Sequence, residues 1–278
     1  MTAQSSARAA TRASAAEPVL VRESAGNIAI LTLNRPKTRN TLSEAMLAAL
    51  GNELAAIAKD RAVRAVVLAA TGPAFSGGHD LKELTARRSD PDHGRAYFRH
   101  IMLTCSAMMQ QIVRLPQPVI AAVQATATAA GCQLVASCDL AVASADAKFG
   151  VSGINAGLFC STPMVALSRN VVRKHAMEML LTGDLISAQD AFRIGLVNRV
   201  VPPGSELEAA LALARKIAGK SAHVVKIGKE AFYRQLEMGL DDAYRYTSDV
   251  MVENMLARDA EEGIAAFVEK RPPKWEDR

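Results

Sequence analysis

The 278-residue sequence has only four cysteines, and their positions say what kind of protein this is not. None of them has the C-x-x-C spacing of a zinc site or a redox pair, and all lie among apolar residues. A disulfide framework and a bound metal are therefore not expected. The pattern favours reduced, buried thiols in a cytosol-like compartment. The four residues are Cys105, Cys132, Cys138 and Cys160.

Aromatic residues are also scarce, at 4% of the chain, and the basic residues are scattered rather than clustered. The formal net charge of +5 is mild. No basic surface with interleaved aromatic side chains is visible, so we expect no nucleic-acid partner. The excess of Lys and Arg suits an anionic small ligand, and a solvated surface explains it equally well.

Two further absences concern membranes and nucleotides. No run of eighteen apolar residues occurs, so the sequence predicts no membrane span. Neither G-x-G-x-x-G after a strand nor G-x-x-x-x-G-K-[ST] is present, which argues against a Rossmann or P-loop nucleotide site.

The N-terminal segment 1–16 contains Arg8 and Arg12 among Ser, Thr and Ala, and it has no acidic residue before Glu17. This composition is typical of a transit peptide and equally of a disordered leader. We predict a disordered tail over 1–17 and a cytoplasmic location. A mitochondrial location is the alternative if 1–16 is a transit segment.

From residue 18 to 220, apolar strand-like runs alternate with amphipathic helical stretches. This order predicts an α/β fold with parallel sheets and right-handed crossovers. One helix is expected after Thr41, because Thr41 and Glu44 have capping-box spacing. From 221 to 278 only helical patterns occur, and an apolar face runs from 240 to 251. That region is either an oligomerisation element or a helical layer packed on its own body.

Two small-residue turns stand out, GPAFSGGHDLKE at 72–83 and ATAAGCQLVASCDL at 127–140. Each follows an apolar strand-like run, at 64–70 and 118–123 respectively. Small residues let a ligand approach the main chain closely. Converging backbone N–H groups are a common way to stabilise an oxyanion. The sequence therefore predicts a site that binds and polarises a carbonyl group.

Read together, these turns and their surroundings resemble the crotonase (enoyl-CoA hydratase/isomerase) superfamily. The similarity extends over nearly everything from residue 18, including a C-terminal RPPKW segment, and it is strongest for one subgroup with GHDLKEL at 78–84. Five stretches carry the match: NRPKTRNTLS at 34–43, GPAFSGGHDLKE at 72–83, PVIAAVQATATAAGCQLVASCDLAVAS at 118–144, KFGVSGINAGL at 148–158 and TGDLISAQDAFRIGLVNRVV at 182–201.

The resemblance implies a crotonase-like spiral of ββα units with a C-terminal helical oligomerisation region. It also implies a homotrimer, or a dimer of trimers, that binds an acyl-CoA thioester and acts in fatty-acid or acyl-CoA metabolism. No cofactor is expected besides the CoA thioester as substrate or ligand, and no metal.

By motif position, the resemblance assigns the two oxyanion donors to the backbone N–H groups of His79 and Ala130. Ala130 begins a predicted helix, where a free N–H and the positive end of the helix dipole coincide. The imidazole of His79 points either toward the acyl group or away from the site. The remaining residues that the resemblance places along the ligand are Asp80, Leu81 and Lys82 beside the hole, and Lys37, Thr38 and Arg39 at the CoA adenine and phosphates.

Two cations within three residues suit phosphate, although an exposed basic loop explains Lys37 and Arg39 as well. The departures from the family pattern are equally informative. Family hydratases use two glutamates, and the matching positions here hold Gln133 and Gly153. Neither residue transfers a proton at ordinary pH.

Other polar groups lie near these positions in the sequence: Ser152, Asn155, Cys160 and Ser161. A nucleophilic Cys160 would need a neighbouring base, and a buried structural thiol is the simpler interpretation. Asp80 and Glu83 are expected to cap and orient their own turn.

Three functions fit these observations. The first is an enzyme of the hydratase/isomerase type whose proton transfer does not come from the two usual glutamates. The second is a non-catalytic acyl-CoA binder or regulator. The third is an assembly subunit for a complete hydratase.

Overall fold

The computed structural model describes residues 17–278. The predictions for the N-terminal segment, a disordered tail or a transit segment, therefore fall outside the described residues except at Glu17. Among residues 17–278, no helix combines the length and apolar character that crossing a membrane requires.

The larger sheet has the strand order β1-β2-β3-β5-β7-β10. β1 and β2 form an antiparallel hairpin, and every later neighbour pairs in parallel. The strands are β1 (Leu20–Ala25), β2 (Ile28–Leu33), β3 (Ala65–Ala70), β5 (Val119–Val123), β7 (Leu140–Ser144) and β10 (Arg199–Val201). β3 and β5 are almost wholly apolar and buried, as expected of parallel strands that are covered on both faces.

A smaller sheet has the order β4-β6-β8-β9. Its strands are β4 (Ala74–Ser76), β6 (Thr126–Thr128), β8 (Lys148–Gly150) and β9 (Ile186–Ser187). The first three of these directly follow β3, β5 and β7 of the larger sheet, and each leads into helical structure. This repeated strand–strand–helix unit is the predicted crotonase-like spiral, so the predicted α/β fold is confirmed.

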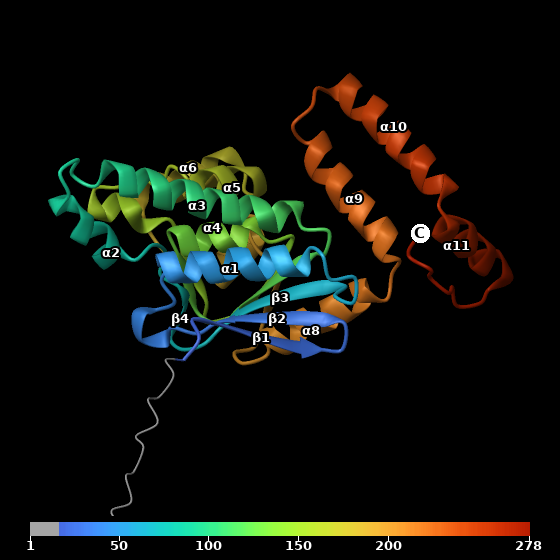
Figure 1. The fold of residues 1–278 in the computed structure, drawn as a ribbon, viewed down its shortest axis with the longest axis horizontal. Helices are drawn as coiled ribbons and strands as arrows, with labels where there is room; N and C mark the ends of the chain where they lie inside the picture. Colours follow the sequence, from blue (N-terminus) through green and yellow to red (C-terminus); the bar gives the residue numbers. More distant parts are fainter. Residues whose placement is uncertain (1–16) are drawn as a thin grey trace, which may run out of the picture.

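Helices cover both faces of the larger sheet. α1 and α3 pack against each other on one side, and α8 contacts β2, β3, β5 and β7 on the other (Figure 1). The helices are α1 (Glu44–Ile57), α2 (Leu81–Ala86), α3 (Arg95–Arg114), α4 (Ala130–Ser137), α5 (Pro163–Asn170), α6 (Arg173–Thr182), α7 (Ala188–Arg193), α8 (Glu206–Ala218), α9 (Ala222–Gln235), α10 (Leu240–Leu256) and α11 (Arg258–Glu269). Three short 3-10 turns are η1 (Pro36–Thr38), η2 (Arg87–Ser89) and η3 (Ser152–Ala156).

The predicted capping box at the start of α1 is wrong. Ser43 is the N-cap, and its side chain accepts a hydrogen bond from the Met46 N–H. Thr41 lies two residues before the cap and instead donates to the Asp80 carboxylate at 3.2 Å. Thr41 and Ser43 both carry a hydroxyl near the helix start, and the hydrogen bond to Asp80 in the 72–83 turn engages Thr41 outside the helix.

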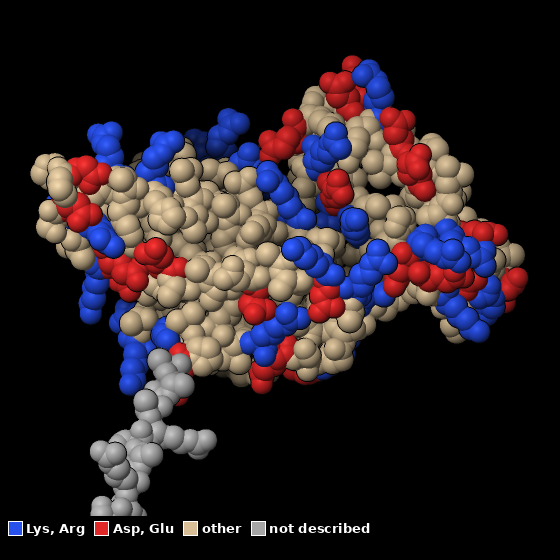
Figure 2. All heavy atoms as spheres, in the orientation of Figure 1, with Lys and Arg blue, Asp and Glu red and all other residues tan. Residues whose placement is uncertain are grey.

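α9, α10 and α11 form an arm that extends away from the sheets (Figure 1). The first helix of the arm is anchored by a buried ion pair between Lys229 and Asp139 at 2.7 Å, and Tyr233 donates to the same carboxylate at 2.9 Å. The chain end returns to the base of the arm, where Trp275 donates to the Gly219 carbonyl. Figure 2 shows Lys, Arg, Asp and Glu interspersed over the arm, with no broad area of one sign on this face.

Candidate functional site

The two small-residue turns meet in space. Gly78 has φ +86°, a conformation that favours glycine. A Cβ at position 78 would lie 2.9 Å from the Ala129 Cβ and 3.1 Å from the Ala130 nitrogen. Because glycine has no side chain, the space beside the Ala130 N–H stays open. The main chain of His79, the next residue, lies near this space.

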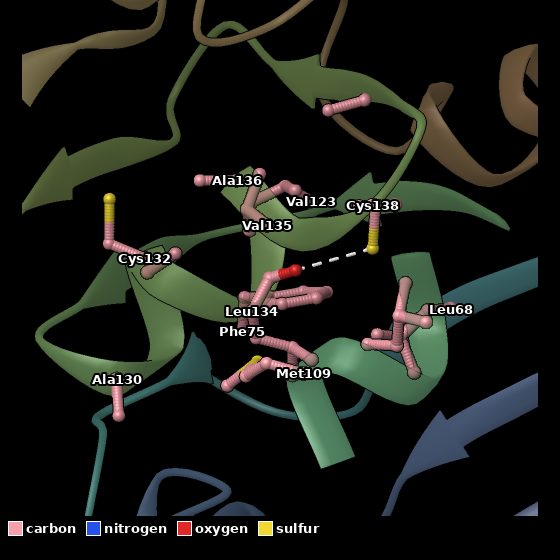
Figure 3. Packing of buried hydrophobic residues seen from close by; sticks show 14 of the residues in the cluster. Leu68, Phe75, Met109, Val123, Ala130, Cys132, Leu134, Val135, Ala136 and Cys138 are labelled. Atoms are coloured by element: carbon pink, nitrogen blue, oxygen red, sulfur yellow. Dashed lines mark hydrogen bonds between the residues drawn. The ribbon is translucent and has the colours of Figure 1, made fainter. Parts of the chain in front are cut away.

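A second glycine fixes the start of α4 against the smaller sheet. A Cβ at Gly131 would lie 2.3 Å from the Ser76 carbonyl oxygen, so only glycine fits there. β4 and β6 pair in parallel just before these turns, with Ser76 opposite Ala127. All eight residues of α4 are buried. In Figure 3, the Ala130 and Cys132 side chains point to opposite sides of the helix start, while Leu134 packs among the core residues around Phe75.

The N–H groups around the turns divide into bonded and free donors. The Ala129 N–H donates to the Gly150 carbonyl at 2.9 Å, and the Gly78 N–H donates to the Ser76 hydroxyl at 3.3 Å. Within residues 17–278, no protein acceptor bonds to the N–H of His79 or to that of Ala130. Ala130 is the first residue of α4, where no intrahelical acceptor exists and the helix dipole is positive. Two free donors on neighbouring turns are the arrangement that an oxyanion requires.

Ala129 connects β6 to α4 with φ 51° and ψ −122°. A non-glycine residue in such a sparsely populated region costs on the order of 1–3 kcal/mol, and such residues cluster at functional sites. The strained linkage turns the chain abruptly from the strand into the helix. The Ala130 N–H is thereby left facing the neighbouring turn at Gly78.

A third turn, at 35–40, braces the other two. The Arg39 carbonyl accepts a hydrogen bond from the Gly77 N–H at 2.9 Å. The Ser76 hydroxyl donates to the Asn40 carbonyl, also at 2.9 Å. Asn40 is fully buried, and its amide donates to the carbonyls of Thr71 and Ala74. Asn40 and Ser76 are positioning residues that the sequence does not single out, since the only signal for each is a polar residue inside a matched stretch.

The same third turn carries the predicted CoA-binding residues. Lys37, Thr38 and Arg39 are all exposed on or directly after η1. Because the Arg39 carbonyl accepts a hydrogen bond from the Gly77 N–H, the turn that carries these residues lies beside the segment of the free His79 N–H. The geometry thus joins an exposed turn with two basic residues to the turn that carries the free His79 N–H.

Asp80 and Glu83 are engaged in holding the turns, as expected. The Asp80 carboxylate caps α2 by accepting from the N–H groups of Lys82 and Glu83, at 2.9 and 3.3 Å. Glu83 accepts from the Glu44 N–H at the start of α1. Leu81, which follows the cap, is 54% exposed, so its apolar side chain is open to solvent. Lys82 is exposed next to it.

The His79 ring is held with both nitrogens buried and without a hydrogen-bond partner among the described residues. Burial lowers its pKa below the ordinary 6.5, and the nearby Leu42 carbonyl, which closes no hydrogen bond, offsets this in part. The ring is therefore neutral at pH 7. Residue 79 pairs with Leu42 in an isolated β-bridge, and the neutral ring adds no charge beside the free His79 N–H.

The two positions that would hold glutamates differ in character. Gln133 is 5% exposed, and its Oε1 is buried without a partner in the described chain. Gly153, in η3, does not have positive φ. A Cβ there would instead lie 2.5 Å from the Leu158 carbonyl oxygen and 2.7 Å from the Cys160 sulfur. Lack of space, rather than backbone conformation, is what keeps a side chain out of position 153.

The other polar groups near these positions have local partners. The hydroxyls of Ser152 and Thr128 lie 2.8 Å apart, which links η3 to the end of β6. Asn155 donates to the Gly183 carbonyl and Ser161 to the Phe159 carbonyl. Burial raises the pKa of the Cys160 thiol. None of these contacts places a base beside that thiol.

Comparisons with known proteins identify the family. The family model described as enoyl-CoA hydratase/isomerase matches residues 23–278. Human enoyl-CoA hydratase domain-containing protein 3, mitochondrial, is 48% identical over 269 residues, covering 97% of this chain and 87% of its own. A putative enoyl-CoA hydratase of Thermus thermophilus is 37% identical over 92% of this chain and 100% of its own.

Solved structures show the same similarity. An enoyl-CoA hydratase of Mycobacterium smegmatis superposes with a TM-score of 0.89 at 53% identity, covering 93% of this chain and 99% of the other. The human domain-containing protein 3 superposes with a TM-score of 0.88 at 49% identity, covering 92% and 100%. The predicted resemblance, including the subgroup marked by GHDLKEL, is confirmed.

Proposed function

This chain belongs to the enoyl-CoA hydratase/isomerase family, and we propose that it binds an acyl-CoA thioester in the oxyanion hole formed by His79 and Ala130. The observation that supports this proposal most directly is the close approach of Gly78 to the Ala130 nitrogen, with a free N–H on each turn. The thioester oxygen would accept a hydrogen bond from each of these two N–H groups. The CoA phosphates would then lie toward Lys37 and Arg39.

The chemical effect of the hole is to polarise the thioester. Two N–H donors and the positive end of α4 stabilise negative charge on the carbonyl oxygen. A proton next to that carbonyl becomes more acidic, and the β-carbon of an unsaturated acyl group becomes more electrophilic. No cofactor other than the CoA thioester is part of this proposal, and the reaction belongs to fatty-acid or acyl-CoA metabolism.

We expect hydration of simple enoyl-CoA to be weak. A positioned general acid or base contributes typically about 10²–10⁴ in rate, and Gln133 and Gly153 supply neither. The protein is therefore proposed as an acyl-CoA-binding family member in which Asp80 and Glu83 keep structural roles. Crotonyl-CoA hydration at roughly 10 per second or faster would contradict this and would show that another group transfers the proton.

The hole itself is tested with Ala130→Pro. Proline removes the N–H at a first helical position, where proline is tolerated. We expect the affinity for butyryl-CoA to fall about tenfold, as for the loss of one hydrogen bond, with the affinity for free CoA unchanged. Any turnover should lose about 2.7–4 kcal/mol of transition-state stabilisation.

Two companion variants make the result specific. Arg173→Pro makes the same change at the first position of α6, away from the hole, and should leave binding intact. Gly78→Ala keeps both N–H groups but places a methyl group 3.1 Å from the Ala130 nitrogen, and should weaken butyryl-CoA binding as well. Unchanged butyryl-CoA affinity in folded Ala130→Pro would mean that the thioester oxygen lies elsewhere.

Compartment and assembly are part of the proposal. The relatives named enoyl-CoA hydratase domain-containing protein 3 from human, rat and Xenopus laevis carry "mitochondrial" in their names, which supports the mitochondrial alternative over a cytoplasmic location. The homotrimer, or dimer of trimers, remains a prediction that rests on the exposed arm.

A further inference from the structure

The peptide group that joins Gly78 to His79 has one end bonded and the other end free. Its carbonyl, that of Gly78, accepts a hydrogen bond from the Leu42 N–H at 2.7 Å. In a planar trans peptide group the C=O and the N–H point in opposite directions. The His79 N–H, one of the two proposed oxyanion donors, therefore points away from the segment that carries Leu42.

The two preceding residues are tied to the same segment. The Gly77 N–H donates to the Arg39 carbonyl and the Ser76 hydroxyl donates to the Asn40 carbonyl, both at 2.9 Å. Ser76 and Asn40 are 0% exposed, so water does not compete for these bonds. The direction of the His79 N–H thus depends on the shape of the main chain at 39–42.

The Asn40 side chain holds that main chain in an unusual shape. Arg39 and Asn40 are consecutive left-handed residues, with φ 55° and 50°. Asparagine adopts this conformation more readily than most residues. Its Oδ1 accepts from the Arg35 N–H at 2.7 Å, and its Nδ2 donates to the carbonyls of Thr71 and Ala74 at 2.8 and 2.9 Å. One buried amide therefore fixes the 35–42 turn to the start of β4.

The other donor of the hole needs no such support. The Ala130 N–H belongs to the peptide group whose carbonyl is that of Ala129, and this carbonyl accepts the Gln133 N–H at 3.1 Å. That bond is the first one of α4, so the helix itself directs the Ala130 N–H. The two donors are thus oriented in different ways, one by a helix and one by a turn that a single side chain holds.

We propose that Asn40 is the positioning residue that aims the His79 N–H at the thioester oxygen, acting through the hydrogen bond from Leu42 to Gly78. The inference rests on the proposed acyl-CoA binding and adds the residue that orients one donor of the hole. Asn40 itself does not touch the ligand. Its loss should therefore weaken the polarisation of the bound thioester even when every site is occupied.

The test measures that polarisation directly. A hydrogen bond to a carbonyl oxygen weakens the C=O bond and lowers its stretching frequency. Infrared difference spectra are recorded with saturating butyryl-CoA that is isotope-labelled at the thioester carbonyl. Asn40→Gly removes the amide while the positive φ stays accessible. We expect the frequency lowering seen with the unaltered protein to shrink by at least half in this variant.

A second buried amide supplies the matched control. Gln117 is 8% exposed, and its Nε2 donates to the carbonyls of Ile57 and Asp60, away from the two turns. Gln117→Ala also removes two buried hydrogen bonds, but it should leave the frequency lowering unchanged. A full lowering in folded Asn40→Gly, or equal reductions in the two variants, would overturn the inference.

A milder variant decides the question if Asn40→Gly does not fold. Ser76→Ala removes the hydroxyl that bonds to the Asn40 carbonyl and accepts from the Gly78 N–H. Ser144→Ala removes another buried hydroxyl, at the end of β7, and is its control. Only Ser76→Ala should reduce the frequency lowering, and an unchanged value there would refute the role of the turn. Failure of the unaltered protein to bind butyryl-CoA, or to lower the frequency of the bound thioester, would instead refute the proposed function.

Discussion

α4 and α10 are helices of opposite surroundings. All eight residues of α4 are buried, whereas none of the seventeen residues of α10 is buried in the part of the chain that the structure describes. α4 lies in the body and provides the Ala130 donor, while α10 lies in the extended arm (Figure 1). The comparison shows that residues of the same chain cover α4 completely, whereas the described residues leave α10 in the arm uncovered.

The open surroundings of α10 have a cost. Leu240, Tyr244, Met251 and Leu256 are all more than half exposed on this helix. Burying apolar surface contributes about 25 cal/mol per Å², and contiguous exposed apolar surface of this kind commonly marks an interaction site. We therefore expect other copies of the chain to cover α10, and we expect changes there to affect assembly rather than the hole.

The largest effect is expected from Tyr244→Lys combined with Met251→Lys. Each large apolar side chain contributes about 1.5–3 kcal/mol when it is fully buried, and the double variant also places two cations in the contact. Analytical ultracentrifugation should show a trimer or hexamer for the unaltered protein and monomer for the variant. Asp249→Lys, an exposed polar position on the same helix, is the control. A monomeric unaltered protein at micromolar concentration would reject the predicted assembly.

The join between arm and body is tested next, with Lys229→Met. This change leaves the Asp139 carboxylate with its bonds from Tyr233 and the Val119 N–H but without its cation. Removing one partner of a buried ion pair costs about 3–5 kcal/mol. Denaturant unfolding should show this loss in the free energy of unfolding.

An exposed ion pair between arm and body supplies the matched control. Arg169 on α5 pairs with Glu237 after α9, and both side chains are more than half exposed. Arg169→Met should cost at most about 1 kcal/mol. Equal losses in the two variants would mean that burial does not determine how firmly the arm is held.

Two glycine substitutions sharpen the comparison at a smaller scale. Gly131→Ala in α4 forces a methyl group to within 2.3 Å of the Ser76 carbonyl, and we expect it to destabilise the fold by about 1–3 kcal/mol. Gly228→Ala in α9 meets nothing within 4 Å and should stabilise by roughly 0.5–1 kcal/mol, because glycine is unfavourable inside a helix. Thermal unfolding should show a loss of stability for Gly131→Ala and a gain for Gly228→Ala. Stabilisation by Gly131→Ala would contradict the packing of α4 on β4.

Much of the body could be predicted from the sequence because its signals are local. The start of α4 at Ala130 and the parallel β3 and β5 follow from apolar runs bounded by small-residue turns. The roles of Asp80 and Glu83 as turn caps follow from their positions. The proposed oxyanion donors come from the family resemblance, and the structure shows the two turns in contact.

The remainder depended on contacts between distant segments. The spacing of Thr41 and Glu44 predicted Thr41 as the helix cap, but Thr41 bonds to Asp80 and Ser43 caps α1. The lack of space at Gly153 depends on Leu158 and Cys160, which no spacing rule places beside it. What covers α10 depends on other molecules and stays a prediction.

The smallest effect is expected at His79, which tests whether the interior around the hole excludes charge. Burial lowers the folded-state pKa below 6.5, so the unfolded chain takes up a proton first as the pH falls. The contribution of neutral His79 is fully present above about pH 6.5. It declines by at most about 1.4 kcal/mol per pH unit below that, until the folded-state pKa is reached. His79→Gln and His79→Ala both lack the titrating ring, and they should share a flatter dependence of the unfolding free energy between pH 7.5 and 5. If the unfolding free energy of both variants depends on pH as in the unaltered protein, the folded state does not lower the pKa of His79. The hole would then be more hydrated than the burial of this ring indicates.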